Sequence, residues 1–353
     1  MTKERSRSVS YAKAIAILLM VLAHAQIFKY GQQWINMFHM PLFFMMSGYC
    51  FKEVYLSDTR SFLNKRFVGI YWPYVKWGLI FLLLHNLFFD INIYSDSFGY
   101  KGTSSELYSL RDFVHKGMAV IFALGDSEQL LGGYWFLREL FLGYIVFYIL
   151  VLFTNKRLMG GAFLLVINMV FLVLGSHNNI YGTQTILAAL FIWVGYMVRQ
   201  HNITFYKKYL FPIVGLMLVS VGTIYWQASC LSISIYTYIP FLISAVWGSL
   251  AVLSLCEAID KCIKLSNNTI LRFLNFIGNN TLTILTWHFL SFKLVSYCII
   301  QIYGLPVKQL SEFPTIEEYA RQGWWLAYFI VGVSLPLCLA YMNTFIKSKW
   351  LKL

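Results

Sequence analysis

Long apolar runs, separated by short polar segments, dominate the chain from near its start to near its end. A helix that crosses a bilayer needs about 20 predominantly apolar residues, within a range of roughly 17–25. By this criterion the pattern predicts about ten membrane-spanning helices. Their approximate bounds are 11–28, 36–54, 67–90, 134–154, 158–175, 184–199, 207–226, 235–257, 279–303 and 323–346.

The runs differ in strength, and so do the connections between them. The run at 184–199 is the weakest, because its unbroken apolar core is short. The long connection 91–133 is polar at first and becomes apolar at 118–124, which predicts an interfacial or re-entrant piece. No repeat with a period of 20–50 residues and no low-complexity tract interrupts the pattern. We therefore predict an all-α integral membrane protein in which residues 1–353 form a single transmembrane domain, with no appended soluble domain.

Composition supports a membrane protein. Hydrophobic residues make up 59% of the chain and charged residues only 12%, against roughly 25% charged residues in soluble domains. This excludes a soluble globular enzyme, a disordered tail and a disulfide scaffold. The net charge of +13 could indicate nucleic-acid binding, so the placement of the charges decides what it means.

The charges are sorted by side of the membrane. With a cytoplasmic N-terminus, the inner segments hold 18 basic residues against five acidic ones, and the outer segments hold six against nine. This is the asymmetry of the positive-inside rule. We therefore expect both termini in the cytoplasm, as an even number of spans requires, and no nucleic-acid partner.

Ionisable groups within the spans cost several kcal/mol each by most measures, which makes them functional candidates. Lys13 and His24 are eleven residues apart, about three helical turns, so they share one stripe of the first helix roughly 16 Å apart. Lys13 could simply extend to the inner headgroups, and His24 could be a neutral core histidine. An imidazole that titrates near pH 6.5 also suits general acid–base chemistry.

Further candidates lie on the second and third predicted spans. His39 precedes Pro41, which kinks a helix, and it could equally be an ordinary residue near the outer interface. Lys65 and Arg66 form a cytoplasmic basic pair. The pair is either part of the topology signal or a site for the phosphates of an anionic cofactor.

The fourth and ninth spans carry the remaining candidates. Tyr134 and Trp135 could belong to an interfacial aromatic belt. The adjacent charges Arg138 and Glu139 are about 100° apart on a helix and would face different neighbours, as in the wall of a polar cavity. His288 falls in mid-helix, as a core histidine or a catalytic group. No metal site is expected, since the six cysteines are scattered and form no C-x-x-C motif.

Several of these stretches, in their order and spacing, resemble the acyltransferase 3 family, and especially its fucose-acetylase-like branch. The matching blocks are Lys13–His24, His39–Gly48, Lys65-Arg66 with Pro73-Tyr74, Tyr134–Leu137, and Ile277–Leu282 with His288. Two positions depart from the family pattern. Lys13 stands where many members have Arg, and Tyr11 stands where Asp is common. A carboxylate partner for the first helix must then come from elsewhere, and Glu139 is one candidate.

The resemblance implies a multi-pass enzyme of the bacterial inner membrane that moves an acyl group, usually acetyl, from acyl-CoA to a sugar hydroxyl of a surface or lipid-linked glycan. It implies His24 as general base, with Lys13 and His288 assisting. His39, Tyr134, Trp135, Arg138 and Glu139 would contact the acceptor, and Lys65 and Arg66 the CoA phosphates. Acetyl-CoA is then a donor substrate, with no permanently bound cofactor, and the partners are acyl-CoA, the glycan and membrane lipid.

Two other classes of protein remain open. A glycan transporter or flippase would also need buried charges along a polar path, although such proteins commonly contain paired repeats with broken helices. No such repeat is visible in this sequence. A membrane sensor or assembly subunit would not need the three intramembrane histidines.

Overall fold

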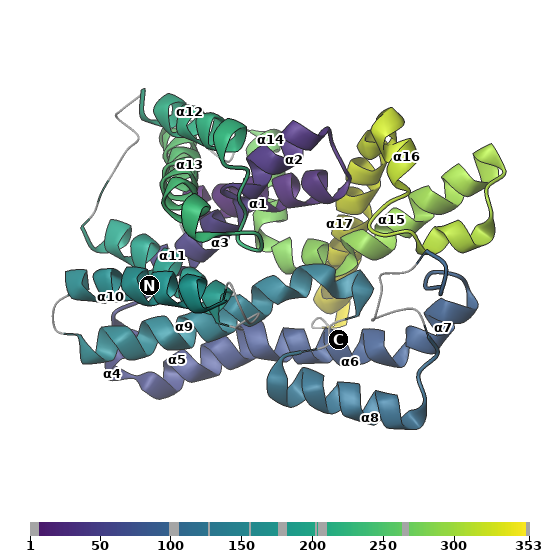
Figure 1. Ribbon diagram of the computed structural model, residues 1–353, viewed down its shortest axis with the longest axis horizontal. Helices are drawn as coiled ribbons and strands as arrows, with labels where there is room; N and C mark the ends of the chain where they lie inside the picture. The colour runs from purple at the N-terminus through teal and green to yellow at the C-terminus, as the bar shows by residue number, and fades with distance from the viewer. Residues whose placement is uncertain are drawn as a thin grey trace. The chain divides into compact units, whose positions relative to one another are not determined.

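The computed structural model describes residues 7–98, 106–125, 128–154, 157–175, 182–201, 203, 210–262 and 268–350 (Figure 1). Of these residues 84% are helical, and none forms a strand. The predicted all-α class is therefore confirmed.

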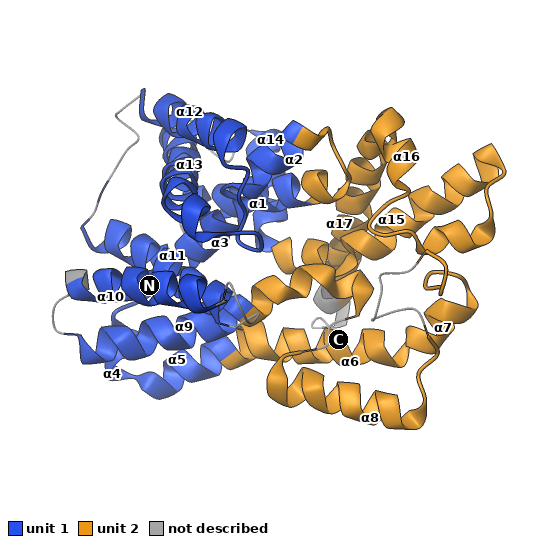
Figure 2. Cartoon of the chain, in the orientation of Figure 1, with its two compact units in different colours: residues 1–20, 30–66, 139–279 blue, residues 21–29, 67–138, 280–353 orange. Residues whose placement is uncertain are grey.

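The chain divides into two compact units (Figure 2). Unit 1 comprises residues 1–20, 30–66 and 139–279, and unit 2 comprises residues 21–29, 67–138 and 280–353. Helices that begin in unit 1, or that lie mostly within it, are α1 (Arg7–His24), α2 (Lys29–Asn36), α3 (His39–Tyr49), α4 (Val54–Ser57), α5 (Thr59–Arg66), α9 (Trp135–Phe153), α10 (Arg157–Gly175), α11 (Thr183–Gln200), α12 (Leu210–Tyr225), α13 (Ile235–Cys262) and α14 (Thr269–Asn279).

Unit 2 contains the end of α1, the start of α9 and a set of shorter elements around two long helices. Its remaining helices are η1 (Phe67–Tyr71), α6 (Trp72–Leu83), α7 (His85–Asp90), α8 (Leu110–Met118), η2 (Ala119–Ala123), η3 (Gln129–Tyr134), α15 (Thr281–Tyr303), η5 (Val307–Ser311), α16 (Glu317–Tyr319), η6 (Ala320–Trp324) and α17 (Trp325–Trp350).

Five helical segments in the described part of the chain are long and apolar enough to cross a membrane. They are Arg7–His24, Gln129–Phe153, Ile235–Cys262, Thr281–Tyr303 and Glu317–Ile346. Each coincides with one of the ten predicted spans. The number of ten and the cytoplasmic placement of the termini stay predictions.

The other five predicted spans coincide with helices that are shorter or less apolar. Apolar helices of intermediate length cover Met159–Leu174 and Leu210–Tyr225, and α11 carries polar residues at both ends. Helix α3 has only 11 residues. Helix α3 begins at His39, so Pro41 lies in its first turn. The N–H that proline lacks would have no partner within the helix at that position. The predicted span 36–54 is therefore interrupted on its N-terminal side.

The packing of α3 against α11 and that of α12 against α13 are the most extensive helix contacts in unit 1. A Cβ atom at Gly48 would overlap the carbonyl oxygen of Ile192, and one at Gly195 would overlap the carbonyl oxygen of Met45. Small residues of this kind let the backbones of two membrane helices approach directly. The two glycines therefore set the distance between α3 and α11.

In unit 2, α15 packs against α17, and α6 packs against η2 and α8. The hydroxyl groups of Ser296 on α15 and Tyr328 on α17 lie 2.9 Å apart. The predicted interfacial piece at 118–124 includes η2, which packs against α6. The hydroxyls of Tyr71, at the end of η1, and of Tyr74, on α6, donate to backbone carbonyls of this piece.

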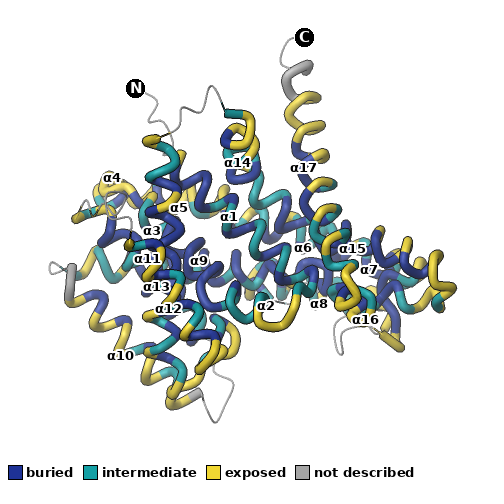
Figure 3. The backbone as a smooth tube through the Cα atoms, turned by 90° about the horizontal axis from the view of Figure 1, so that it is seen from above, coloured by how far each residue is buried: buried dark blue, intermediate teal, exposed yellow. Residues whose placement is uncertain are grey.

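Exposed residues lie along several helices (Figure 3), and on α10 and α12 many of them are apolar. On α12 the exposed residues recur at helical spacing, and they are Leu210, Ile213, Val214, Met217, Val221 and Ile224. On α10 they are Met159, Phe163, Val166 and Val170. Contiguous apolar faces of this length are typical of helices that contact lipid rather than water.

Candidate functional site

Two histidines from distant parts of the sequence meet in unit 2. His24 is the last residue of α1, and His288 lies on α15, 264 positions later. The Nδ1 atom of His24 lies 3.1 Å from Nε2 of His288. The ring planes differ by 11° and the ring centroids are 5.3 Å apart. His288 is fully buried, whereas His24 is half-buried.

The backbone of α15 fixes which nitrogen of each neutral ring carries the proton. Nδ1 of His288 lies 3.1 Å from the carbonyl oxygen of Ile284 and 3.0 Å from that of Leu285. Carbonyl oxygens only accept, so Nδ1 of His288 is the donor and its Nε2 is an acceptor. Nδ1 of His24 then donates to this Nε2. The lone pair of His24 is consequently on its own Nε2, the atom that can act as a base.

Aromatic rings surround this histidine pair. The Phe289 ring centroid lies 4.8 Å from that of His24 and 3.9 Å from that of His288. Phe313 packs on Phe289 at 4.6 Å. Rings packed this closely lower the local dielectric constant and so strengthen electrostatic interactions with any charge that develops there.

The segment η3 packs against α15 near His288. The hydroxyl groups of Tyr134 and Thr286 lie 2.7 Å apart, and Tyr134 is fully buried. A Cβ atom at Gly133 would lie 2.8 Å from Cδ1 of Leu285 and 3.9 Å from Cε1 of His288. The backbone of η3 thus lies directly against the turn of α15 that carries His288.

The structure brings together only some of the residues that the sequence singles out. His24, His288 and Tyr134 gather in unit 2. Trp135 and Arg138, both half-buried, follow on the first turn of α9 within the same unit. The other candidates belong to unit 1, and they are Lys13, His39, Lys65, Arg66 and Glu139.

Within unit 1 these residues have identifiable neighbours. Buried His39 donates from Nδ1 to the carbonyl oxygen of Ile35 at 2.8 Å, which joins the start of α3 to the end of α2. Glu139 is buried and accepts a hydrogen bond from Thr185. Their predicted contacts with an acceptor stay predictions.

The basic pair is split between two environments. Exposed Lys65 donates to the hydroxyl of Tyr55 at 2.9 Å. The Arg66 guanidinium lies over the Tyr144 ring, 3.8 Å from its centroid. Its Nε is buried and has no hydrogen-bond partner among the described residues. Of the two, Arg66 has the more fixed orientation, because its guanidinium is stacked on an aromatic ring.

Comparison with protein families gives a match over nearly the whole chain. The model of the acyltransferase 3 family, described as an acyltransferase domain, matches residues 6–342. The chain belongs to this family. It is accordingly a multi-pass membrane protein with acyltransferase character. No curated protein and no solved structure matches it.

The histidine pair joins two sequence blocks of this acyltransferase 3 member. One block, Lys13–His24, lies on α1, and the other, Ile277–Leu282 with His288, spans α14 and the start of α15. Asn280 occupies the position before α15, although its side chain makes no capping bond. The two blocks therefore meet through tertiary packing.

Lys293, one of the intramembrane cations, binds the protein backbone. Its Nζ donates to the carbonyl oxygens of Leu310 at 2.8 Å and Glu312 at 2.7 Å. These bonds compensate for the burial of the amine. They also fix the segment that carries Phe313. Because Phe313 packs on Phe289, which contacts both histidines, Lys293 helps to hold these aromatic rings in place.

One buried pair in unit 2 was missed by sequence reasoning. Nδ1 of His85 lies 2.9 Å from Oε2 of Glu128, and both side chains are almost fully buried. The sequence shows His85 near the end of a predicted span and Glu128 in an outer connection, with nothing that pairs them. Among the described residues, no three His, Cys, Asp or Glu side chains gather as a metal site would require.

Proposed function

We propose that this protein transfers an acyl group, acetyl as the default, from acyl-CoA to a sugar hydroxyl of a surface polysaccharide or lipid-linked glycan. The observation that supports the proposal is the His24–His288 pair. Its hydrogen bonds leave the lone pair of His24 on Nε2, and family membership makes acyl transfer the reaction to be served. A neutral imidazole in a site with little water is suited to activate a weak nucleophile such as a hydroxyl.

In the proposed reaction, Nε2 of His24 accepts the proton of the sugar hydroxyl as its oxygen attacks the thioester carbonyl. A C–O bond forms and the C–S bond breaks. The imidazolium then returns the proton to the departing thiolate, which gives the ester and free CoA. While His24 carries the charge, its Nδ1–H bond to His288 becomes charge-assisted and stronger, so the pair stabilises the transition state more than the ground state.

Other residues take roles that rest on the family resemblance. Arg66 and Lys65 would bind the CoA phosphates at the cytoplasmic side of an inner membrane. Lys13 would hold the cofactor or polarise its carbonyl. The acceptor side would be formed by His39, Tyr134, Trp135, Arg138 and Glu139.

The test uses purified protein in liposomes, acetyl-CoA, and polysaccharide extracted from the surface of the producing cell. We expect release of CoA thiol together with new ester in the glycan. His24→Ala should abolish both, because it removes the proposed base, while membrane level and thermal stability stay unchanged. His115→Ala is the matched control, since His115 is exposed on α8, and it should retain full transfer.

Two results would contradict the proposal. Full ester formation by His24→Ala would remove His24 from the role of base. Movement of the glycan across the liposome membrane by the wild type, without acetyl-CoA and without ester formation, would support a glycan transporter or flippase instead.

A further inference from the structure

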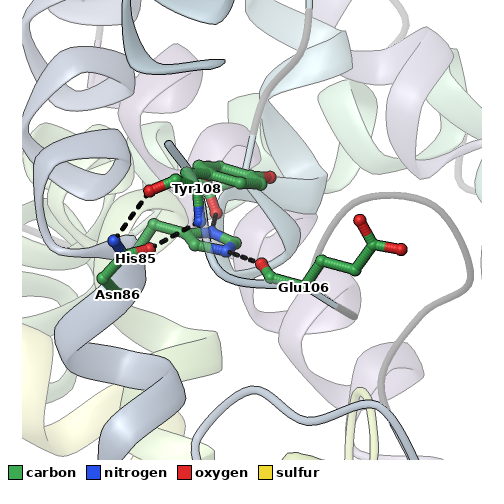
Figure 4. A network of polar contacts seen from close by, with 5 residues as sticks. His85, Asn86, Glu106 and Tyr108 are labelled. Carbon is green, nitrogen blue, oxygen red and sulfur yellow. Dashed lines mark hydrogen bonds and ion pairs between the residues drawn. The ribbon is translucent and has the colours of Figure 1, made fainter. Parts of the chain in front are cut away.

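His85 and Glu128 form the centre of a second buried network, and Figure 4 shows His85 with Asn86, Glu106 and Tyr108. His85 begins α7, and both of its ring nitrogens face oxygen atoms: Nδ1 faces Oε2 of Glu128, and Nε2 faces the carbonyl oxygen of Glu106, each at 2.9 Å. The Tyr108 ring stacks on the imidazole with centroids 3.4 Å apart. Asn86 bonds both the N–H and the carbonyl of Tyr108.

The geometry determines how many protons this network holds. A carbonyl oxygen only accepts, so Nε2 of His85 carries the proton that faces Glu106. A second proton must lie between Nδ1 and the Glu128 carboxyl group. On His85 it gives an imidazolium–carboxylate pair, and on Glu128 it gives two neutral groups, with the same net charge. Loss of this proton leaves two lone pairs facing each other, and the bond between His85 and Glu128 is lost.

Three other titratable side chains lie near the pair. Tyr94 is buried with its ring centroid 5.1 Å from that of His85, Tyr108 stacks on His85, and Lys116 lies 4.9 Å from the centre of the Tyr108 ring. Burial raises the pKa of Glu128 above its ordinary value, although the hydrogen bond and charge of His85, the Tyr94 hydroxyl and the charge of Lys116 act in the opposite direction. Burial and the charge of Glu128 raise the pKa of Tyr94, which stays protonated.

The pair connects to the histidine site through η3. Glu128 immediately precedes η3, and its carbonyl oxygen accepts the N–H of Leu131 at 2.8 Å, which closes the first turn. Five and six residues after Glu128, Gly133 packs against the turn of α15 that carries His288, and Tyr134 meets Thr286. An anchor at Glu128 therefore fixes one end of the segment that lies against His288.

We propose that the His85–Glu128 pair is a positioning pair for the reaction: it holds η3, and η3 keeps His288 aligned to accept the hydrogen bond from His24. The inference rests on the proposed function only for its kinetic consequence. Because the folded-state pKa of Glu128 is raised, the native protein holds its proton more tightly than the unfolded chain does. The contribution of the protonated pair to the stability of the folded protein is therefore complete in acid. It is lost as the pH rises through the folded-state pKa of Glu128.

The first measurement needs no acceptor substrate. Diethyl pyrocarbonate modifies accessible neutral histidines, and mass spectrometry of the full-length protein in detergent gives the rate at His288, which is buried in the wild type. Glu128→Ala should raise this rate several-fold, because η3 no longer covers the turn. Asn86→Ala is the matched control: it removes two bonds to Tyr108 in the same network but leaves Glu128 in place, so the rate should stay at the wild-type value.

The second measurement is kinetic, with acetyl-CoA and the surface polysaccharide. Glu128→Ala should lower kcat by about 10- to 100-fold, the scale expected when reacting groups are misplaced by about 1 Å, with the KM for acetyl-CoA unchanged. Glu128→Gln should restore kcat, since its amide N–H donates to Nδ1 of neutral His85. It should also lack the decline of kcat with rising pH that we expect of the wild type, because the amide does not titrate.

The outcomes separate the two proposals. Equal labelling of His288 in Glu128→Ala and the wild type, or equal increases in Glu128→Ala and Asn86→Ala, would overturn the positioning role, as would an unchanged kcat. A pH profile of Glu128→Gln that superimposes on that of the wild type would contradict the proton assignment. If the wild type forms no ester at all, the proposed function fails, and the labelling experiment still decides the inference.

Discussion

A histidine acts as a base only through the ring nitrogen that carries no proton, so the hydrogen bonds behind it decide its chemistry. In this protein the decisive acceptors are backbone carbonyls of α15, which fix His288 and, through it, His24. The same reasoning at the residue scale distinguishes the two members of the basic pair. Lys65 is exposed, while Arg66 is held flat against Tyr144 with a buried donor.

Arg66 should therefore dominate any binding of CoA phosphate. We expect Arg66→Gln to raise the KM for acetyl-CoA about tenfold or more, since a hydrogen bond to a charged group contributes about 1.5–3 kcal/mol. Lys65→Gln should change it less than about twofold, as exposed ion pairs contribute little. Steady-state kinetics with acetyl-CoA and 3′-dephospho-acetyl-CoA provides the measurement.

Comparison of the two acyl donors, acetyl-CoA and 3′-dephospho-acetyl-CoA, also shows which phosphate Arg66 contacts. If Arg66 binds the 3′-phosphate, Arg66→Gln and removal of that phosphate should each raise KM, and combining them should add nothing further. An unchanged KM in Arg66→Gln with both donors would leave the basic pair as a topology signal only. Thermal unfolding in detergent controls for the loss of packing on Tyr144.

At the scale of elements, packing rests on small residues where helices touch. The contact between α3 and α11 leaves no space for a side chain at Gly48 or Gly195. Adjacent small residues such as Ser47-Gly48 allow another helix to approach closely. The sequence alone could not identify α11 as the partner, because the reciprocal contacts join segments about 150 residues apart.

Gly48→Ala should destabilise unit 1. The new methyl group would overlap a backbone carbonyl of α11, which cannot move aside as a flexible side chain could, so we expect a loss of about 3 kcal/mol or more in the free energy of unfolding. Gly69→Ala is the matched control, because a Cβ there meets nothing within 4 Å. It should be neutral or slightly stabilising. Thermal unfolding in detergent measures both, and equal midpoints would contradict the close contact.

At the scale of the whole molecule, charge and apolar length describe different properties. Five helical segments in the described residues meet the length and hydropathy of a membrane span. The excess of 18 basic over five acidic residues in the predicted inner segments predicts the side of the membrane for each loop, because basic residues near a span are retained in the cytoplasm. The apolar length of a helix follows from its solvation in lipid, and the charge asymmetry follows from the way the chain is inserted into the membrane.

The predicted topology can be checked by labelling single cysteines in a cysteine-free background with an impermeant maleimide. In intact cells we expect labelling at the outer positions of Arg111→Cys and Lys308→Cys. Asp58→Cys and Lys261→Cys should react only after the membrane is opened. All four native residues are exposed, so a failure to label reflects sidedness. Labelling of Lys261→Cys in intact cells would contradict the ten-span arrangement.

The sequence by itself determined the class of the protein and the identity of the strongest candidates. Apolar runs must be helical in lipid, since every backbone polar group has to be bonded within the segment. A charged or titratable residue within such a run is costly enough to draw attention. His24 and His288 were found in this way, and Arg66 was found as part of a basic pair beside a predicted span.

Only the tertiary structure decided which of these residues meet and what their protons do. His24 and His288 are 264 positions apart, and no local pattern records that their nitrogens share a hydrogen bond. Lys293 lies in an apolar run of the sequence, and only the fold brings the carbonyl oxygens of Leu310 and Glu312 to its amine. Glu128 is one of several outer acidic residues until packing buries it against His85. Burial and pairing depend on contacts between distant segments, so the protonation and charge of the site could not be predicted from the sequence alone.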